Sequence, residues 1–362
     1  MRTLTKLGAL TAASVGFAFA LPLEDLRFGP ESGSTLSKTY TTEFDMELDD
    51  LSLLVSGQDL GAMFEPSMSF AGSSEVSFTD EYGSISDGKP TRLTRTFDSL
   101  GLESSTSIEM MGESQEEGAE AVSPLDGLTV VFSWDEESGD YTAEFGEEST
   151  GDEELLEGLT EDTDLRWLLP EGGVAVDESW SFDPSQMEHL LFPSGDLGWA
   201  PEGAEDVDME EFEELFEQFG DELMDSLDGL LDGEGTATFT GAREADGRTV
   251  GAIALEAEIS SSADLASTIQ DLIESAVSEA GEEVPDDLEI YVEAADVSIE
   301  LEAQGELLWD MDTGSAHSMT MDGEFEFTID LIVSATAEGE TQDLEVGMSM
   351  SGVMTAGLET SR

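Results

Sequence analysis

Few residues in this sequence are of the types that carry out chemistry. His189 and His317 are the only imidazoles, and there is no cysteine. The Gly-x-Ser-x-Gly elbow, the Gly-rich phosphate loop, the dinucleotide-binding glycine pattern and His-Glu-x-x-His are all missing from the sequence. Carboxylate pairs could in principle hydrolyse glycosides, but no pair stands out among 86 acidic residues. We therefore predict no catalytic residue, no enzymatic activity and no cofactor.

Oxygen ligands at partial calcium-binding spacing occur in two segments. Asp310 and Asp312 belong to the run Asp-Met-Asp-Thr-Gly, and residues 206–210 read Asp-Val-Asp-Met-Glu. Calcium prefers such oxygen ligands. The first segment has its glycine one position early and lacks the closing acid, and the second lacks the turn glycine. Asp310 and Asp312 are the candidate metal ligands, and a hairpin turn explains them equally well.

Methionine and phenylalanine gather on the predicted C-terminal strands and on one predicted helix. Methionine adapts to ligands of varied shape, so an apolar cleft between sheet and helix is a candidate site for a lipid or another hydrophobic small molecule. The alternative is an ordinary packed core between these elements. The candidate cleft residues are Phe212, Phe216, Phe219, Met319, Met321, Phe325, Phe327, Met348 and Met350.

Period-two alternation of apolar and polar residues predicts the strands that must position these side chains. It is clear in residues 40–48, in hairpins over 128–145 and 236–259, and in three long strands between 288 and 350. Asp246-Gly247 supplies the positive φ that a tight hairpin turn requires. The broken alternation at residues 294–296 predicts a β-bulge. The last three strands, joined by short turns, predict an antiparallel meander.

Helical spacing of apolar residues occurs in two segments, 206–231 and 264–280. Shorter helical turns are expected near 154–159 and 185–192. These elements predict an α+β fold: a curved, mainly antiparallel, half-barrel-like β-sheet with a few amphipathic helices packed on one face.

The chain contains no Pro- or Ser-rich linker that would divide this fold. We expect a single domain, residues 21–362, built from two half-units at about 36–200 and 201–358. Acidic disordered loops are expected near 112–122, 146–154 and 198–208.

The charge balance is extreme, with 86 acidic and 11 basic residues and a formal charge of −75 over 362 residues. Binding nucleic acid through its phosphates needs Lys and Arg, so a nucleic-acid partner is excluded. A solvated acidic surface explains the charge, and a surface that binds divalent cations is the alternative.

The N-terminal residues have the pattern of a secretory signal peptide. Arg2 and Lys6 lie at the start, residues 7–19 are largely apolar, and Ala18-Phe19-Ala20 fits a cleavage site. We expect residues 1–20 to be removed after Ala20 and the protein to be exported to the periplasm or the extracellular space. The apolar stretch is too short to span a bilayer, and no later stretch is long enough, so no membrane span is expected after cleavage.

One segment resembles a known family. The run Leu-Leu-Pro-Glu-Gly-Gly-Val-Ala-Val-Asp-Glu-Ser-Trp at residues 168–180 is similar to the LP…V-x-V-G-D-x-W element of an uncharacterised family of exported bacterial proteins. The family's Gly-Asp is replaced here by Asp177-Glu178. The resemblance extends over about residues 40–335. It implies structural roles for Pro170 and Trp180, and a fold similar to periplasmic lipoprotein carriers and other half-barrel lipid-binding proteins. The family has no assigned activity.

Three hypotheses follow. The first is a non-catalytic envelope protein that binds a lipid or another hydrophobic ligand in its cleft. The second is a structural or interaction module with an acidic, cation-responsive surface. The third, which the scarcity of His, Lys and Cys disfavours, is a hydrolase.

Overall fold

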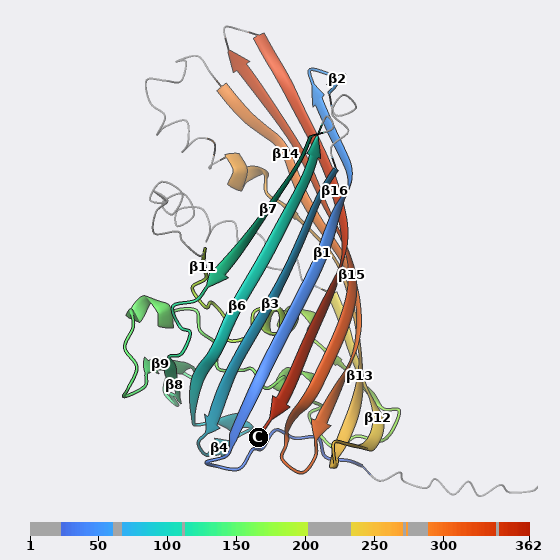
Figure 1. The fold of residues 1–362 in the computed structure, drawn as a ribbon. Coiled ribbons are helices and arrows are strands. Elements are labelled where there is room, and N and C mark those ends of the chain that lie inside the picture. Colours follow the sequence, from blue (N-terminus) through green and yellow to red (C-terminus); the bar gives the residue numbers. More distant parts are fainter. Residues whose placement is uncertain are drawn as a thin grey trace, which may run out of the picture.

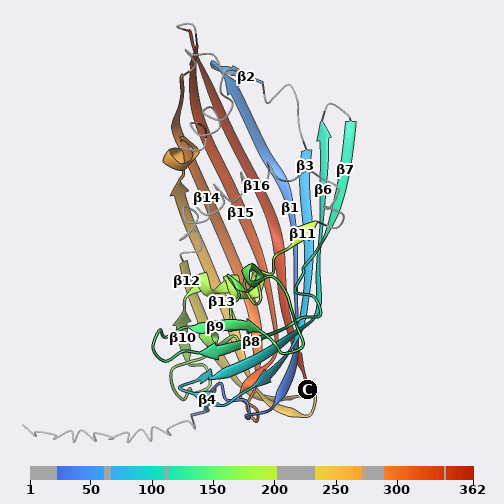
Figure 2. The same ribbon diagram turned by 90° about the vertical axis from the view of Figure 1, so that its left-hand side faces the viewer.

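The computed structural model describes residues 23–60, 67–110, 113–201, 233–270, 273, 289–337 and 340–362. Most of these residues belong to one 14-stranded sheet, in which β10-β12-β13-β14-β15-β16-β1-β3-β6-β7-β11 is the order of neighbours. Every pairing between its strands is antiparallel. The predicted class is confirmed: the sheet is curved, open and mainly antiparallel, with short helices on its concave side (Figures 1 and 2).

The sheet is formed by long strands at its centre and shorter ones at its edges. The long strands are β1 (Thr35–Val55), β3 (Ser67–Tyr82), β6 (Arg92–Met110), β13 (Arg248–Asp264), β14 (Glu289–Asp310), β15 (Ser315–Ala337) and β16 (Glu340–Ser361). The shorter ones are β2 (Gln58–Asp59), β7 (Glu113–Val122), β8 (Thr129–Trp134), β9 (Tyr141–Phe145), β10 (Ser179–Phe182), β11 (Ala200–Pro201) and β12 (Gly233–Ala245). A separate two-stranded ladder joins β4 (Ile85–Ser86) and β5 (Lys89–Pro90).

The two faces of the sheet differ in chemistry, as period-two alternation requires. In β15, Met319 and Met321 are buried on the concave face, whereas Asp322, Glu324 and Glu326 are exposed on the convex face. The same alternation recurs in β13 and β14. The sheet therefore has one apolar face and one acidic face.

The hydrophobic core fills the end of the concave face where β1 begins and β16 ends. Residues 123–199 pack there against the sheet, through β8, β9, the 3-10 helices η2 (Glu153–Leu156), η3 (Arg166–Leu168) and η4 (Pro184–Met187), and the helix α1 (Glu188–Leu191). Figure 2 shows these elements inside the curve of the sheet. Trp309, Phe78, Phe97, Phe132 and Phe239 are fully buried in this core.

The predicted hairpins are confirmed as β8–β9 and β12–β13, with Asp246 and Gly247 at positive φ. A register shift between Val292 and Ala294 confirms the bulge in β14. The predicted helical turns near 154–159 and 185–192 correspond to η2, η4 and α1.

The prediction of a loop near 112–122 was wrong, because residues 113–122 form β7, paired with β6. This strand has four Glu among its ten residues and no apolar residue larger than valine. It lies near an edge of the sheet, so its sequence shows no clear apolar alternation. Residues 146–154 contain a turn and the start of η2, and no strand. Of the predicted loop at 198–208, Ala200 and Pro201 form β11 and residues 202–208 lie outside the described residues. The predicted helix at 206–231 lies outside the described residues, and of 264–280 the structure describes a helix at 266–270 and residue 273.

Candidate apolar ligand site

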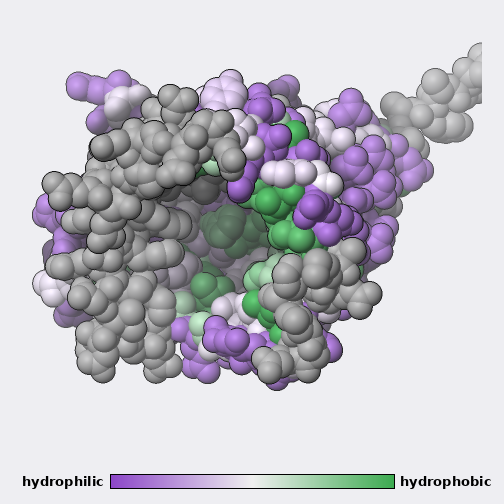
Figure 3. All heavy atoms as spheres, turned by 90° about the horizontal axis from the view of Figure 1, so that it is seen from above, coloured by the Kyte–Doolittle hydropathy of each residue, from purple (hydrophilic) through white to green (hydrophobic). Residues whose placement is uncertain are grey.

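An apolar cavity of about 350 Å³ lies on the concave face of the sheet. Its floor is formed by side chains of β1, β3, β6, β14, β15 and β16, and its wall by α1 and the loop that follows. Seen from above, the molecule is hollowed and hydrophobic residues lie in the hollow (Figure 3). The principal lining side chains are Phe44, Leu102, Phe192, Trp199, Leu301, Phe325 and Met354.

Two glycines shape the floor by letting aromatic rings lie flat on the backbone. A Cβ at Gly72 would overlap the ring of Phe44, and a Cβ at Gly352 would lie 2.7 Å from Phe325 Cζ. Cross-strand pairing places Phe44 opposite Gly72 and Phe325 opposite Gly352. The two rings therefore cover neighbouring strands and form a smooth apolar floor.

The mouth of the cavity is unusually apolar for a surface. Phe192 is 64% exposed and Phe44 is 41% exposed, although both line the cavity. Among the described residues that line it, Glu43 is the only ionisable one. Exposed aromatic side chains that converge on a concave apolar surface are typical of a binding site.

The wall is anchored at Ser194 and Gly195. Both have positive φ, 78° and 81° respectively, and a Cβ at Gly195 would collide with the carbonyl oxygen of Gly158. The Thr160 amide donates to the Ser194 carbonyl oxygen at 2.8 Å. Arg95 Nη1 donates to Ser194 Oγ at 2.8 Å and to the Thr160 carbonyl oxygen at 3.0 Å. The cavity wall is thus tied to β6 through one guanidinium.

That guanidinium belongs to a buried ionic network, formed by Lys38, Asp80, Arg95 and Asp164 with Thr163. Asp80 accepts from Arg95 Nε at 2.8 Å and from Lys38 Nζ at 2.9 Å, and Lys38 Nζ also donates to Asp164 at 2.6 Å. All four charged side chains are at most 1% exposed. Burial favours the neutral form of Asp80, but Arg95 and Lys38 outweigh it and hold the pKa of Asp80 below its usual value. The network joins three strands to residues 160–164.

A second buried carboxylate adjoins this network. Glu161 Oε2 accepts from Arg166 Nη2 at 2.6 Å, and its Oε1 has no hydrogen-bond partner. Burial, reinforced by the nearby charges of Asp162 and Asp164, raises the pKa of Glu161 to about 7 against the opposing effect of Arg166. Glu161 therefore titrates near neutral pH.

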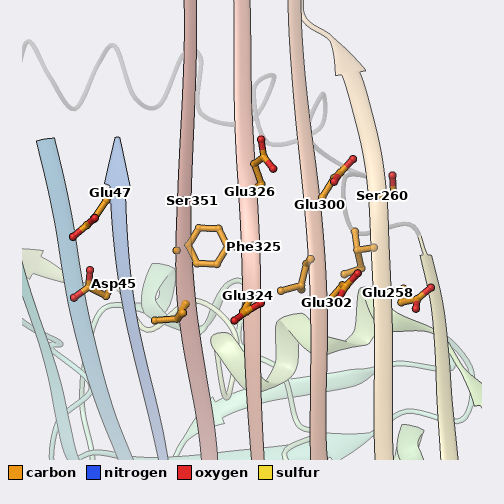
Figure 4. A pocket seen from close by; sticks show the side chains of 14 residues that line it. Asp45, Glu47, Glu258, Ser260, Glu300, Glu302, Glu324, Phe325, Glu326 and Ser351 are labelled. Atoms are coloured by element: carbon orange, nitrogen blue, oxygen red, sulfur yellow. The ribbon is translucent and has the colours of Figure 1, made fainter. Parts of the chain in front are cut away.

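The convex face has a shallow groove of about 840 Å³. Carboxylates from β1, β13, β14 and β15 line it, and Figure 4 shows those of β13, β14 and β15 on adjacent strands, with Asp45 and Glu47 of β1 beyond Ser351. Glu302 is directly opposite both Glu258 and Glu324, and like charges in that arrangement repel. No group of three or more acidic or histidine side chains in the described residues could hold a metal ion. Dissolved salt therefore lowers the repulsion between the carboxylates of this groove.

Of the predicted cleft residues, Phe325 lines the cavity. Met319, Met321 and Met350 are buried side chains of the same face, and Phe327 and Met348 lie on that face farther along the strands. Phe212, Phe216 and Phe219 lie outside the described residues.

The predicted calcium ligands, Asp310 and Asp312, lie at the turn between β14 and β15. Asp310 is buried, and its Oδ1 accepts from the amides of Asp312 and Thr313 at 3.0 and 3.1 Å. Its Oδ2 lies 3.4 Å from Arg248 and 3.6 Å from Arg362. The carboxylate thus closes a hairpin turn, which was the alternative explanation.

The two residues with predicted structural roles lie near the core. Trp180 in β10 is half-buried, packs against the core and donates through Nε1 to the Leu168 carbonyl oxygen at 3.0 Å. Pro170 lies between η3 and β10 and is half-buried.

Sequence reasoning missed the cavity wall and the ionic network. A usable signal existed for the network, because Lys38, Asp80 and Arg95 each occupy an apolar-face position of a strand. Lys38 alternates with Leu36 and Tyr40, and Arg95 with Leu93 and Phe97. No comparable signal marks Phe192 and Trp199, which lie in an irregular loop.

The chain has only weak similarity to known proteins. No protein-family model matches the chain, and no curated protein matches its sequence. It is similar to an outer membrane channel from Pseudomonas putida F1, with 8% identity and a TM-score of 0.21 over 94% of this chain and 98% of that one. It is also similar to the transport unit of the autotransporter AIDA-I from Escherichia coli, with 9% identity and a TM-score of 0.16 over 91% and 90%. At these TM-scores neither similarity supports an inference about this chain. Among the described residues, no helix is long and apolar enough to cross a membrane.

Proposed function

We propose that this is an exported cell-envelope protein that binds a lipid or another hydrophobic small molecule in the cavity on its concave face. The observation that carries the proposal is the apolar cavity with Phe44 and Phe192 exposed at its mouth. Its volume of about 350 Å³ falls at the lower end of the range of about 300–1,000 Å³ that is usual for small-molecule sites.

Covering the exposed aromatic rings would favour the binding of an apolar ligand. Fully burying a phenylalanine side chain contributes about 1.5–3 kcal/mol, and a ligand would cover the exposed parts of two such rings. Glu43 is the single ionisable side chain among the lining residues that the structure describes, so the role we propose is binding rather than catalysis.

Export is supported by the sequence. The basic start, the apolar stretch and the Ala18-Phe19-Ala20 site fit a signal peptide. The resemblance of residues 168–180 to exported bacterial proteins points to the same location. We therefore place the mature protein in the periplasm or outside the cell.

The test is the binding of Nile red, a neutral hydrophobic dye, to the mature protein, with native mass spectrometry of co-purified ligands alongside. Phe192→Asp should weaken dye binding about tenfold, which corresponds to about 1.4 kcal/mol. Tyr291→Asp is the matched control, because Tyr291 is 63% exposed and does not line the cavity. Unchanged dye binding by folded Phe192→Asp and Phe44→Asp would refute the cavity as the site.

A second candidate function, a cation-responsive interaction module, is favoured by the facing carboxylates of the convex groove. It requires calcium to raise the melting temperature more than sodium chloride does at equal ionic strength. An equal effect of the two salts would reduce this candidate to charge screening.

A further inference from the structure

The apolar floor of the cavity continues along the strands. Beyond Phe325, the concave face of β15 presents Phe327, Ile329 and Leu331, and the pairing sets Met350, Met348 and Val346 of β16 opposite them. All of these except Met350 are partly exposed. These three cross-strand pairs form three rows, and the distance along β15 from Phe325 to the third row is on the order of 20 Å at about 3.3 Å per residue. Phe327, Ile329 and Leu331 also pack against a second hydrophobic cluster, formed by Leu265, Val292, Ala295 and Val297. The apolar track that a ligand meets beyond the cavity is therefore the part of these side chains that this cluster leaves exposed.

The positive charges of the protein lie away from this track. Beyond residue 22 the chain has nine basic residues. The register of the sheet places Lys38, Arg92, Arg95, Arg243 and Arg248 near the end where β1 begins and β16 ends. The other four contact residues at the same end: Arg27 contacts Trp309, Lys89 contacts Trp134, Arg166 contacts Gly88 and Arg362 contacts Asp310. None of them lines the cavity or belongs to the three rows.

The charged side chains that line the cavity or flank its floor residues along the strands are negative. Glu324 and Glu326 flank Phe325 in β15 and project from the convex face of the same strand. Glu300 and Glu302 flank Leu301 of the floor in β14 in the same way. The sheet is a single backbone layer here, since Phe325 and Leu301 border both the cavity and the convex groove. Fixed carboxylates behind the floor, with no cation in front of it, give the cavity a negative potential.

We infer that the ligand is a long-chain, extended apolar molecule whose polar end is neutral or cationic. This inference rests on the proposed function and adds the class of ligand to it. A chain aligned with the strands matches the track, and the excess of negative charge repels carboxylate or phosphate ends.

The experiment displaces Nile red with dodecanol, dodecylamine and dodecanoate at pH 8. Dodecanoate should bind at least about tenfold more weakly than dodecanol at 0.05 M salt, because unscreened like charges repel it. The difference should shrink at 1 M salt, where the screening length is about 3 Å. The double variant Glu324→Gln/Glu326→Gln should reduce the difference in affinity between dodecanol and dodecanoate at 0.05 M salt. The control Glu137→Gln, in the exposed β8–β9 turn, should leave that difference unchanged.

A second experiment tests the length of the ligand by comparing dodecanol with hexanol. Leu331→Asp, in the third row, should weaken the binding of dodecanol about tenfold. It should leave the binding of hexanol unchanged, since the shorter chain stays within the cavity. The Tyr291→Asp variant again controls for an added charge on an exposed strand.

The outcomes separate the inference from the proposed function. Dye binding with equal affinity for dodecanol and dodecanoate would overturn the inference and leave the function standing. Absence of any dye or alcohol binding would overturn both. A concentration-dependent dimer that Phe192→Asp dissolves would assign the cavity to a second copy of the chain, which also overturns both.

Discussion

Replacing Asp80 by asparagine tests the buried ionic network most directly. The change keeps the size of the side chain and removes one negative charge. In the wild-type protein two cations, Lys38 and Arg95, face two anions, Asp80 and Asp164, at distances of 2.6–2.9 Å. The variant leaves one positive charge without a counterion in a site from which water is excluded.

The expected cost follows from that imbalance. Breaking a buried ion pair by removing one partner typically costs about 3–5 kcal/mol, because the remaining charge stays desolvated. Asp80 accepts hydrogen bonds from both Arg95 and Lys38, so we expect the upper part of that range. A loss of this size is a large fraction of the usual stability of a domain, about 5–15 kcal/mol.

The assay is urea unfolding at pH 7 and fixed salt, followed by tryptophan fluorescence. Asp98→Asn is the matched control: Asp98 is exposed and accepts from Thr79 Oγ1, and its change should shift the free energy of unfolding by no more than about 0.5 kcal/mol. The wild-type contribution of Asp80, whose pKa is lowered, should be present at neutral pH and lost as the pH falls through its folded pKa. Equal stability of the two variants would refute the network as a stabilising element.

Three further predictions concern the same region. Because the pKa of Glu161 is raised from 4.5 to about 7, wild-type stability should fall by about 3 kcal/mol between pH 4.5 and pH 8 relative to Glu161→Gln; parallel pH profiles of the two proteins in urea unfolding would contradict this. Gly195→Ala should lower the free energy of unfolding by about 1–3 kcal/mol and weaken Nile red binding, since the position has positive φ and no room for a methyl group. The control Gly29→Ala, with open space around it, should change neither quantity. Gly72→Ala should lift the Phe44 ring and weaken dye binding more than it lowers the melting temperature; a fall in melting temperature with unchanged dye affinity would show that Phe44 does not form the floor.

Much of the sheet could be predicted from the sequence because its strands alternate strictly. The β8–β9 and β12–β13 hairpins follow from alternation on both sides of Gly-containing turns, and the bulge near Ala294 follows from its interruption. Strand ends could not be predicted in the same way. Residues 349–361 of β16 are rich in Ser, Gly and Thr, and they are strand because β1 and β15 both pair with them.

The candidate site was predicted in part. The apolar concave face with Phe325 follows from the period-two pattern, but the cavity depends on a wall that folds back from a distant part of the chain. Phe192 and Trp199 take their positions from Ser194 and Gly195, whose contacts with Arg95 and Gly158 are long-range. Local spacing contains no information about such contacts.

The pairing of β1 with β16 has a consequence for how the protein folds. The first and last long strands lie side by side at the centre of the sheet, so Ser37 pairs with Ser361 across nearly the whole chain. Contacts of such long range form slowly, because closing the intervening loop costs entropy before the pairing repays it. During synthesis, β1 cannot pair with β16 until β16 itself has been made. A chain that ends before β16 would expose unpaired edges on both β1 and β15, and such edges promote aggregation. β16, which comes after the other strands of this sheet in the sequence, is therefore the strand that joins the two halves of the sheet.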